Sequence, residues 1–346
     1  MFLTEKEILD TPIALEKTCK LFRDKQAEVA AFFQKNTQRK FTFLGCGSSY
    51  MLAKSAAAVF SAVPNTTASA IPAGDYIVNQ RFWEEAAKGS IVVSISRSGR
   101  TSELVRAVKH IKENWGCPVV SLSMEDGNDI MPMSDLDMTM DWCYDRSVCQ
   151  TRTVTNLYAA LLLLAAAYAG DATLSESVEM AAATNDAFQK ENRAELEKLA
   201  KLPWKNVTVL ADGPVCGIAE EAALAFTEIA MLAGRYFHML DYRHGPIVIS
   251  NQDTLTLVLV SPAEEALQKD MVRDVMSHGG PVVTVSSHQQ NVFGSTAHIC
   301  MPDIKAFAAW GILFIYLGQM LALLKSVELG GNPDAPQGLD AFITLK

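Results

Sequence analysis

The sequence has no pair of cysteines with C-x-x-C spacing and no run of basic residues. Its seven cysteines, an odd number, are spread along the whole chain: Cys19, Cys46, Cys117, Cys143, Cys149, Cys216 and Cys300. This pattern argues against a disulfide scaffold or a zinc ribbon, and it favours a reducing cytoplasm. The 30 basic residues are scattered among 39 acidic ones, for a net charge of −9. We therefore expect neither nucleic acid nor an anionic membrane surface as a partner.

The first ten residues lack the basic-then-apolar pattern of a signal peptide. Two apolar segments need a separate check for a membrane span. Residues 157–170 are too few to cross a bilayer, whereas residues 306–324 are long enough and are interrupted only by Gln319. The second segment occupies the same place in its half of the chain as the first, which favours a buried helix over a membrane span.

Hydrophobic residues make up 49% of the 346 residues, which is enough for a large core, and the length suggests two domains. Short apolar runs alternate with helical segments, in the same order in both halves. In the first half the predicted strands are residues 41–47, 90–96, 118–123 and 136–140; in the second they are residues 207–213, 254–261, 280–286 and 298–301. Continuous apolar strands between helices are typical of parallel sheets covered on both faces.

The sequence therefore predicts an α/β fold with two tandem doubly wound parallel sheets, each forming a three-layer αβα domain. We expect the first domain at residues 25–170, the second at 195–330, and a C-terminal tail at 331–346. A charged helical stretch, residues 175–202, would link the two domains.

Two loops of the first half are candidates for ligand binding, because ligands of parallel sheets bind at the carboxyl ends of the strands. Residues 45–50 follow the first predicted strand, and residues 96–103 follow the second. The second loop carries four hydroxyl side chains, Ser96, Ser98, Thr101 and Ser102. Hydroxyls and amides at a helix start favour a phosphate site, although a single Ser or Thr there would only cap the helix. Neither loop has a full dinucleotide-binding or Walker motif, so no nucleotide cofactor is expected.

Five segments together resemble the tandem SIS (sugar isomerase) domain family: LGCGSSY at 44–50, SRSGRT at 96–101, VCQTR at 148–152, EAALAFTE at 221–228 and RHGP at 243–246. The resemblance covers about residues 25–346. It is strongest to the isomerase half of glucosamine-6-phosphate synthase, the galactosamine-6-phosphate deaminase/isomerases and the fructosamine-6-phosphate deglycases.

The resemblance implies roles for twelve residues. Hydroxyls of both loops would hold the phosphate of a sugar phosphate: Ser49, Ser96, Ser98 and Thr101. Other residues of the same motifs would line the sugar pocket or bind beside it: Cys46, Gly47, Ser48, Arg97, Val148 and Gln150. Glu228 resembles the general base that moves a proton between C1 and C2. His244 resembles the residue that assists ring opening in a site made largely by another subunit, which implies a homodimer with shared active sites.

Simpler interpretations stay open for these residues. Glu228 lies in an apolar helical segment and could form a structural ion pair with an arginine, although proton transfer beside a carbonyl does need a partly buried carboxylate. His244 could be structural, and the following Gly-Pro indicates a tight turn. His238 and His244 lack a third ligand at zinc spacing, so no metal is expected. Cys46 has no histidine near it in sequence to activate it as a nucleophile.

The chain also departs from the synthase pattern. Ala341 and Ala225 stand where the synthase has lysines, Arg97 replaces a glutamine, and the chain carries no segment expected to act as a glutaminase. We therefore expect an enzyme that isomerises an amino-sugar or fructosamine 6-phosphate, or that couples isomerisation to deamination or deglycation. The alternative is a non-catalytic sensor that binds sugar phosphates.

Overall fold

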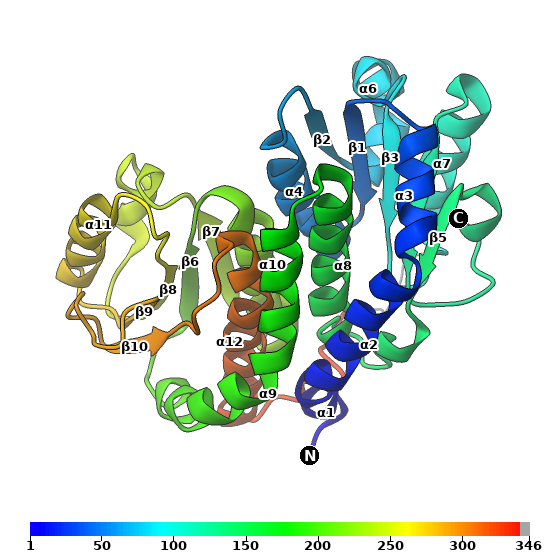
Figure 1. Cartoon of the computed structure of the whole chain (residues 1–346). Coiled ribbons are helices and arrows are strands. Elements are labelled where there is room, and N and C mark those ends of the chain that lie inside the picture. Colours follow the sequence, from blue (N-terminus) through cyan, green and yellow to red (C-terminus); the bar gives the residue numbers. More distant parts are fainter. Residues whose placement is uncertain (340–346) are drawn as a thin grey trace.

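The computed structural model describes residues 1–339, which form two parallel β-sheets lying side by side with helices around and between them (Figure 1). Each sheet has five strands, and every neighbouring pair of strands is parallel. The order is β2-β1-β3-β4-β5 in the first sheet and β10-β9-β8-β6-β7 in the second. Because strand order reverses beside β1 and beside β6, both sheets are doubly wound, which confirms the predicted fold class.

The first sheet is built from residues 40–139. Its strands are β1 (Lys40–Gly45), β2 (Thr67–Pro72), β3 (Ile91–Ile95), β4 (Val119–Ser123) and β5 (Leu136–Thr139). The helices before, between and after them are α1 (Leu3–Leu9), α2 (Thr11–Asp24), α3 (Gln26–Lys35), α4 (Ser48–Ser61), α5 (Ala73–Val78), α6 (Gln80–Ala87), α7 (Ser102–Trp115) and α8 (Arg152–Ala169). Strands β1, β3 and β4 are almost wholly buried, as their continuous apolar sequences predict.

The second sheet repeats this plan. Its strands are β6 (Asn206–Leu210), β7 (Ala233–Phe237), β8 (Thr254–Leu259), β9 (Val282–Ser286) and β10 (Ala297–Cys300). Its helices are α9 (Ala172–Ala200), α10 (Cys216–Ile229), α11 (Glu265–Ser277) and α12 (Phe307–Glu328). Both halves also contain short 3₁₀ turns: η1 (Met131–Met133) and η2 (Asp141–Cys143) in the first, and η3 (Gly213–Val215), η4 (Asp241–Arg243) and η5 (Pro246–Ile249) in the second.

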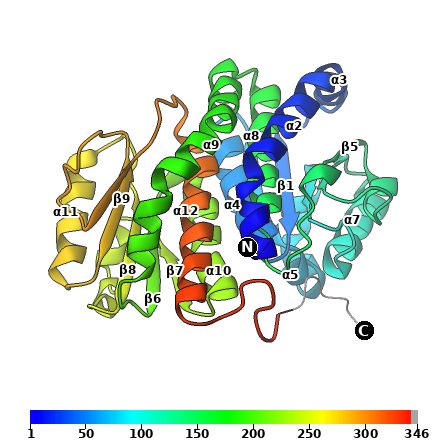
Figure 2. The ribbon, with the colours of Figure 1, turned by 90° about the horizontal axis from the view of Figure 1, so that it is seen from below.

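One continuous apolar core fills the space between the sheets, where α4, α8, α9, α10 and α12 pack together (Figure 2). Helices α8 and α12 are long and apolar enough to cross a membrane by length and composition alone. Within their apolar windows, however, 78% and 89% of the residues are buried inside the protein. The core helices of a globular protein have these same properties, so the two helices are weak evidence for a membrane span.

Helices α4 and α10 cross unusually closely and thereby join the two halves. A Cβ atom on Gly217 would lie 1.9 Å from the carbonyl oxygen of Met51. The Ser55 hydroxyl accepts hydrogen bonds from the amides of Gly217 (2.9 Å) and Ile218 (3.1 Å). Lys54 and Glu220 form an ion pair of 2.6 Å across the same crossing. Glycine at position 217 therefore sets how near α10 comes to the first sheet.

The sequence did not predict β2, β7, α5 or α6. Both strands lie at sheet edges and pair on one side only, and most of their residues stay partly exposed. They therefore need no continuous apolar run, and their sequences gave no strand signal. Helix α10 ends at Ile229, and Met231 takes a left-handed conformation (φ 55°) before β7 begins.

Candidate active site

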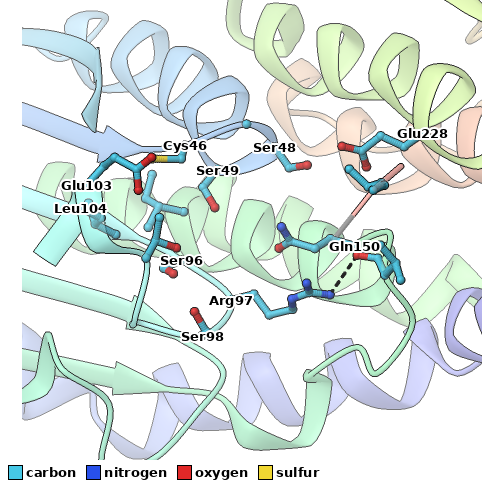
Figure 3. A pocket seen from close by; sticks show the side chains of 15 residues that line it. Cys46, Ser48, Ser49, Ser96, Arg97, Ser98, Glu103, Leu104, Gln150 and Glu228 are labelled. Atoms are coloured by element: carbon cyan, nitrogen blue, oxygen red, sulfur yellow. Dashed lines mark hydrogen bonds between the residues drawn. The ribbon is translucent and has the colours of Figure 1, made fainter. Parts of the chain in front are cut away.

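The candidate site lies where β1 and β3 end, on the two sides of the switch in strand order of the first sheet. A pocket opens there between three loops of the first half and α10 of the second half (Figure 3). Fifteen residues line it: Cys46, Gly47, Ser48, Ser49, Ile95, Ser96, Arg97, Ser98, Thr101, Glu103, Leu104, Val148, Gln150, Glu228 and Leu339.

The first loop turns sharply from β1 into α4. Gly45 permits this turn, because a Cβ atom there would lie 2.5 Å from the backbone of Ser49. Gly47 has a positive φ of 52°, which glycine adopts without strain. The helix begins at Ser48, and both this serine and Ser49 line the pocket. Burial and the nearby Glu103 raise the pKa of Cys46 to about 11, so its thiol is a poor nucleophile at neutral pH.

The second loop forms a compact turn before α7. The Ser96 hydroxyl accepts a hydrogen bond from the amide of Gly99 (2.9 Å), and the Ser98 hydroxyl accepts one from the amide of Arg100 (3.2 Å). Gly99 has a φ of 62°, and a Cβ atom there would lie 2.3 Å from the Asn128 side chain. These bonds hold the hydroxyls at the positive end of α7, which suits an anion.

Arg97 is the one positively charged side chain that lines the pocket within residues 1–339. It is only 5% exposed, and its guanidinium donates to the carbonyl oxygens of Ser147 (2.9 Å) and Val148 (3.3 Å). The bond to Val148 is the dashed line in Figure 3. Arg100 does not line the pocket, because it pairs with Glu125 and Asp129, each at 3.1 Å. A single buried guanidinium therefore supplies the positive charge of this site.

Glu228 reaches the pocket from α10, on the side opposite Cys46 and Glu103 (Figure 3). Burial raises the pKa of its carboxyl group above the ordinary value, and the positive charge of Arg97 offsets part of that rise. Such a carboxylate can accept a proton near neutral pH.

A second carboxyl group, Glu221, lies two helical turns earlier on α10. It is 1% exposed, and one of its oxygens has no hydrogen-bond partner. Burial, together with the nearby Glu228, raises its pKa well above the ordinary value, while a hydrogen bond from Ser48 acts in the opposite direction.

The pocket brings together eleven of the twelve residues proposed from the sequence. The exception is His244, which lies exposed after η4 and does not line this pocket; its place in a neighbouring subunit's site stays a prediction. Ala341 lies outside the described residues. Sequence reasoning missed Ile95, Glu103, Leu104 and Leu339. Glu103 and Leu104 belong to the first turn of α7, directly after the hydroxyl-rich loop that the sequence did indicate.

Within residues 1–339 no group of three or more His, Cys, Asp and Glu side chains is arranged to hold a metal ion. His238 was considered as a metal ligand from the sequence. Its Nδ1 forms a hydrogen bond of 2.9 Å with the Asp212 carboxylate.

Comparison with known proteins finds one domain family and several relatives of similar sequence. Residues 36–167 match the SIS domain family model. Among curated relatives, the glutamine–fructose-6-phosphate aminotransferase (isomerizing) of Zymomonas mobilis is 24% identical over 99% of this chain. A D-galactosamine-6-phosphate deaminase of Escherichia coli is 25% identical over 78% of this chain and 73% of its own length. This chain spans only 58% of the length of the Zymomonas protein.

Solved structures agree on the fold. A glucosamine-6-phosphate deaminase from Thermotoga maritima superposes with a TM-score of 0.82 at 22% identity, over 99% of this chain and 100% of that one. A tagatose-6-phosphate ketose/aldose isomerase from Escherichia coli gives 0.87 at 21% identity, over 96% and 95%. The match to the SIS domain covers residues 36–167, and the curated relatives named above are an isomerizing aminotransferase and an amino-sugar-phosphate deaminase.

Proposed function

We propose that this protein is an enzyme that moves a proton between C1 and C2 of an amino-sugar or fructosamine 6-phosphate. The observation that carries the proposal is the pairing, in one pocket, of a hydroxyl-rich anion cradle with the Glu228 carboxylate, whose pKa is raised by burial. The cradle fits the 6-phosphate of an open-chain sugar. The carboxylate fits a general base for the C–H bond beside the carbonyl or imine carbon.

In the proposed reaction the substrate supplies the nitrogen. With a 2-amino-2-deoxy aldose, Glu228 removes the proton from C2 and returns it to C1, while a second proton passes from the amine nitrogen to O1. The aldehyde and amine thereby become a C1 hydroxyl group and a 2-imine. Water then adds to the imine carbon and ammonia leaves, giving the ketose phosphate. No enzyme lysine is required for these steps, which agrees with Ala225 on α10.

A substrate panel tests the proposal. Hexosamine and fructosamine 6-phosphates are incubated with the protein and assayed for ammonia, for released amino acid and for isomerised sugar. Ammonia release would identify deamination, amino-acid release deglycation, and isomerised sugar alone a simple isomerase. No turnover of any member would contradict the proposal and favour the sensor.

The phosphate should dominate affinity. We expect glucosamine 6-phosphate to bind at least about tenfold more tightly than glucosamine in calorimetry, because the cradle of the second loop would bind the phosphate group, which glucosamine lacks. Ser98→Ala should reduce this difference without changing the thermal unfolding temperature greatly. Ser102→Ala serves as the matched control, since Ser102 starts α7 but does not line the pocket. Equal affinities for the two sugars would contradict the assignment of the cradle.

We also propose a homodimer in which His244 completes the partner's site. His244 is exposed, and no histidine lines the pocket within residues 1–339. Glu228→Gln and His244→Ala chains should each be inactive alone. After subunit exchange, an equal mixture should recover about a quarter of wild-type activity, since half of the dimers are mixed and each of these has one intact site. Exchange without any recovery, with mixed dimers verified by native mass spectrometry, would refute the shared site.

A further inference from the structure

The third loop of the pocket, residues 145–151, is irregular, yet it carries two lining residues, Val148 and Gln150. Its first anchor is Asp145, which is buried and accepts hydrogen bonds from the amides of Thr151 (2.7 Å) and Thr153 (2.8 Å). Asp145 therefore fixes the two ends of the loop to each other and leaves the peptide groups between them to be held by other parts of the chain.

Those middle peptide groups are held by Glu7, which belongs to α1 near the N-terminus. Glu7 is 3% exposed. Its carboxylate accepts hydrogen bonds from the amides of Arg146 (2.6 Å) and Ser147 (3.3 Å), and from the hydroxyl of Ser147. Every one of these donors belongs to the third loop, so a single buried carboxylate binds the loop in three places.

Carbonyl groups of the same loop face Arg97, whose guanidinium donates to the carbonyl oxygen of Asp145 (3.4 Å), in the peptide group whose N–H, that of Arg146, Glu7 binds. The carbonyl oxygens of Ser147 and Val148 accept from its guanidinium, as described above. The loop therefore lies between an anion, which its N–H groups face, and a cation, which its carbonyl groups face. At the peptide group between Asp145 and Arg146, each charge stabilises the orientation that the other one requires, because the two ends of a peptide dipole carry opposite partial charges.

We propose that Glu7 is a positioning residue of the active site. It holds the loop so that the carbonyl groups of Ser147 and Val148 orient Arg97 and so that Val148 and Gln150 face the substrate. Helix α1 is thereby part of the wall that supports the pocket. The consequence for binding rests on the proposed function, whereas the consequence for the loop does not.

A second contact of α1 supports this role. Its first amides, from Leu3 and Thr4, donate to the Asp334 carboxylate at 2.8 Å and 2.7 Å. Asp334 belongs to the segment that leaves α12 and passes α1 (Figure 2), and this segment reaches the pocket at Leu339. Two separate walls of the pocket are therefore bonded to the same short helix.

Glu7→Gln tests the proposal, because it keeps the shape of the side chain but removes the charge and places an N–H₂ group among three donors. We expect the amides of Arg146 and Ser147 to exchange hydrogen at least about tenfold faster. We also expect glucosamine 6-phosphate to bind about tenfold more weakly in calorimetry, with KM for the turned-over substrate rising more than kcat falls. Ser147→Ala removes one donor from the other side and should give the same effects at smaller size.

Glu5→Gln is the matched control. Glu5 lies on the same helix and pairs with Arg193 at 2.9 Å, away from the loop. Both glutamine variants should lower thermal stability, but only Glu7→Gln should alter loop exchange and affinity. Unchanged exchange in Glu7→Gln, or equal affinity losses in the two variants, would overturn the positioning role. If the wild type binds no sugar phosphate, the proposed function fails, and the exchange measurement still decides the role of Glu7.

Discussion

Glu228→Gln is expected to lose about 10²-fold or more in kcat while ligand affinity changes little. Glutamine keeps the size and most of the hydrogen bonding of the carboxylate, but it cannot accept the proton. Because burial raises the pKa of Glu228 toward neutrality, the wild-type group can both take the proton from one carbon and return it to the other. An amide can do neither.

The clearest measurement is exchange of the substrate's C1 or C2 hydrogen with deuterated water, followed by NMR, because it records proton transfer even when product release limits turnover. Glu220→Gln is the control. It lies on the same helix and pairs with Lys54 rather than lining the pocket. Exchange that persists undiminished in Glu228→Gln would refute the base assignment. A wild type that binds sugar phosphates but shows neither exchange nor turnover would identify a sensor.

The central strands and the loops that follow them could be predicted from the sequence, because both are local signals. A buried parallel strand needs a continuous apolar run, and β1, β3 and β8 have one. The hydroxyl-rich loop could be predicted because its serines, its glycine and the start of the next helix follow one another directly in the sequence. Of the edge strands, β5 and β10 were predicted, whereas β2 and β7 gave no such signal, since half-exposed positions accept polar residues.

The remaining parts of the site depend on contacts between distant segments. Glu228 faces the first-half loops because α10 crosses α4 at Gly217, and periodicity within either helix does not predict that crossing. Glu7 lies more than a hundred residues from the loop that it holds. Short polar helices such as α1 resemble ordinary exposed helices in sequence, so only the folded chain reveals that one of its carboxylates is buried against backbone donors.

Arg97→Gln should produce the other large effect, in two measurable parts. The substitution removes the one positive charge that lines the pocket in residues 1–339 and leaves two carboxyl groups, Glu103 and Glu228, around an anionic ligand. A hydrogen bond to a charged group contributes about 1.5–3 kcal/mol, which corresponds to a loss of roughly 10- to 100-fold in affinity for the sugar phosphate. Glucosamine without the phosphate should lose much less.

The second part is a shift in the pH profile, and its sign follows from the charges. Burial raises the pKa of Glu228, and Arg97 lowers it. Without the guanidinium only the raising effect remains, so the carboxylate should become protonated at a higher pH. Because a base acts in its deprotonated form, the acid limb of the kcat/KM profile should move to higher pH in Arg97→Gln.

Arg97→Lys keeps the charge and should leave the limb near its wild-type position, even if loss of the bonds to Ser147 and Val148 weakens binding. An acid limb that stays in place in Arg97→Gln, with the fold verified by circular dichroism, would show that the charge of Arg97 does not affect the pKa of Glu228.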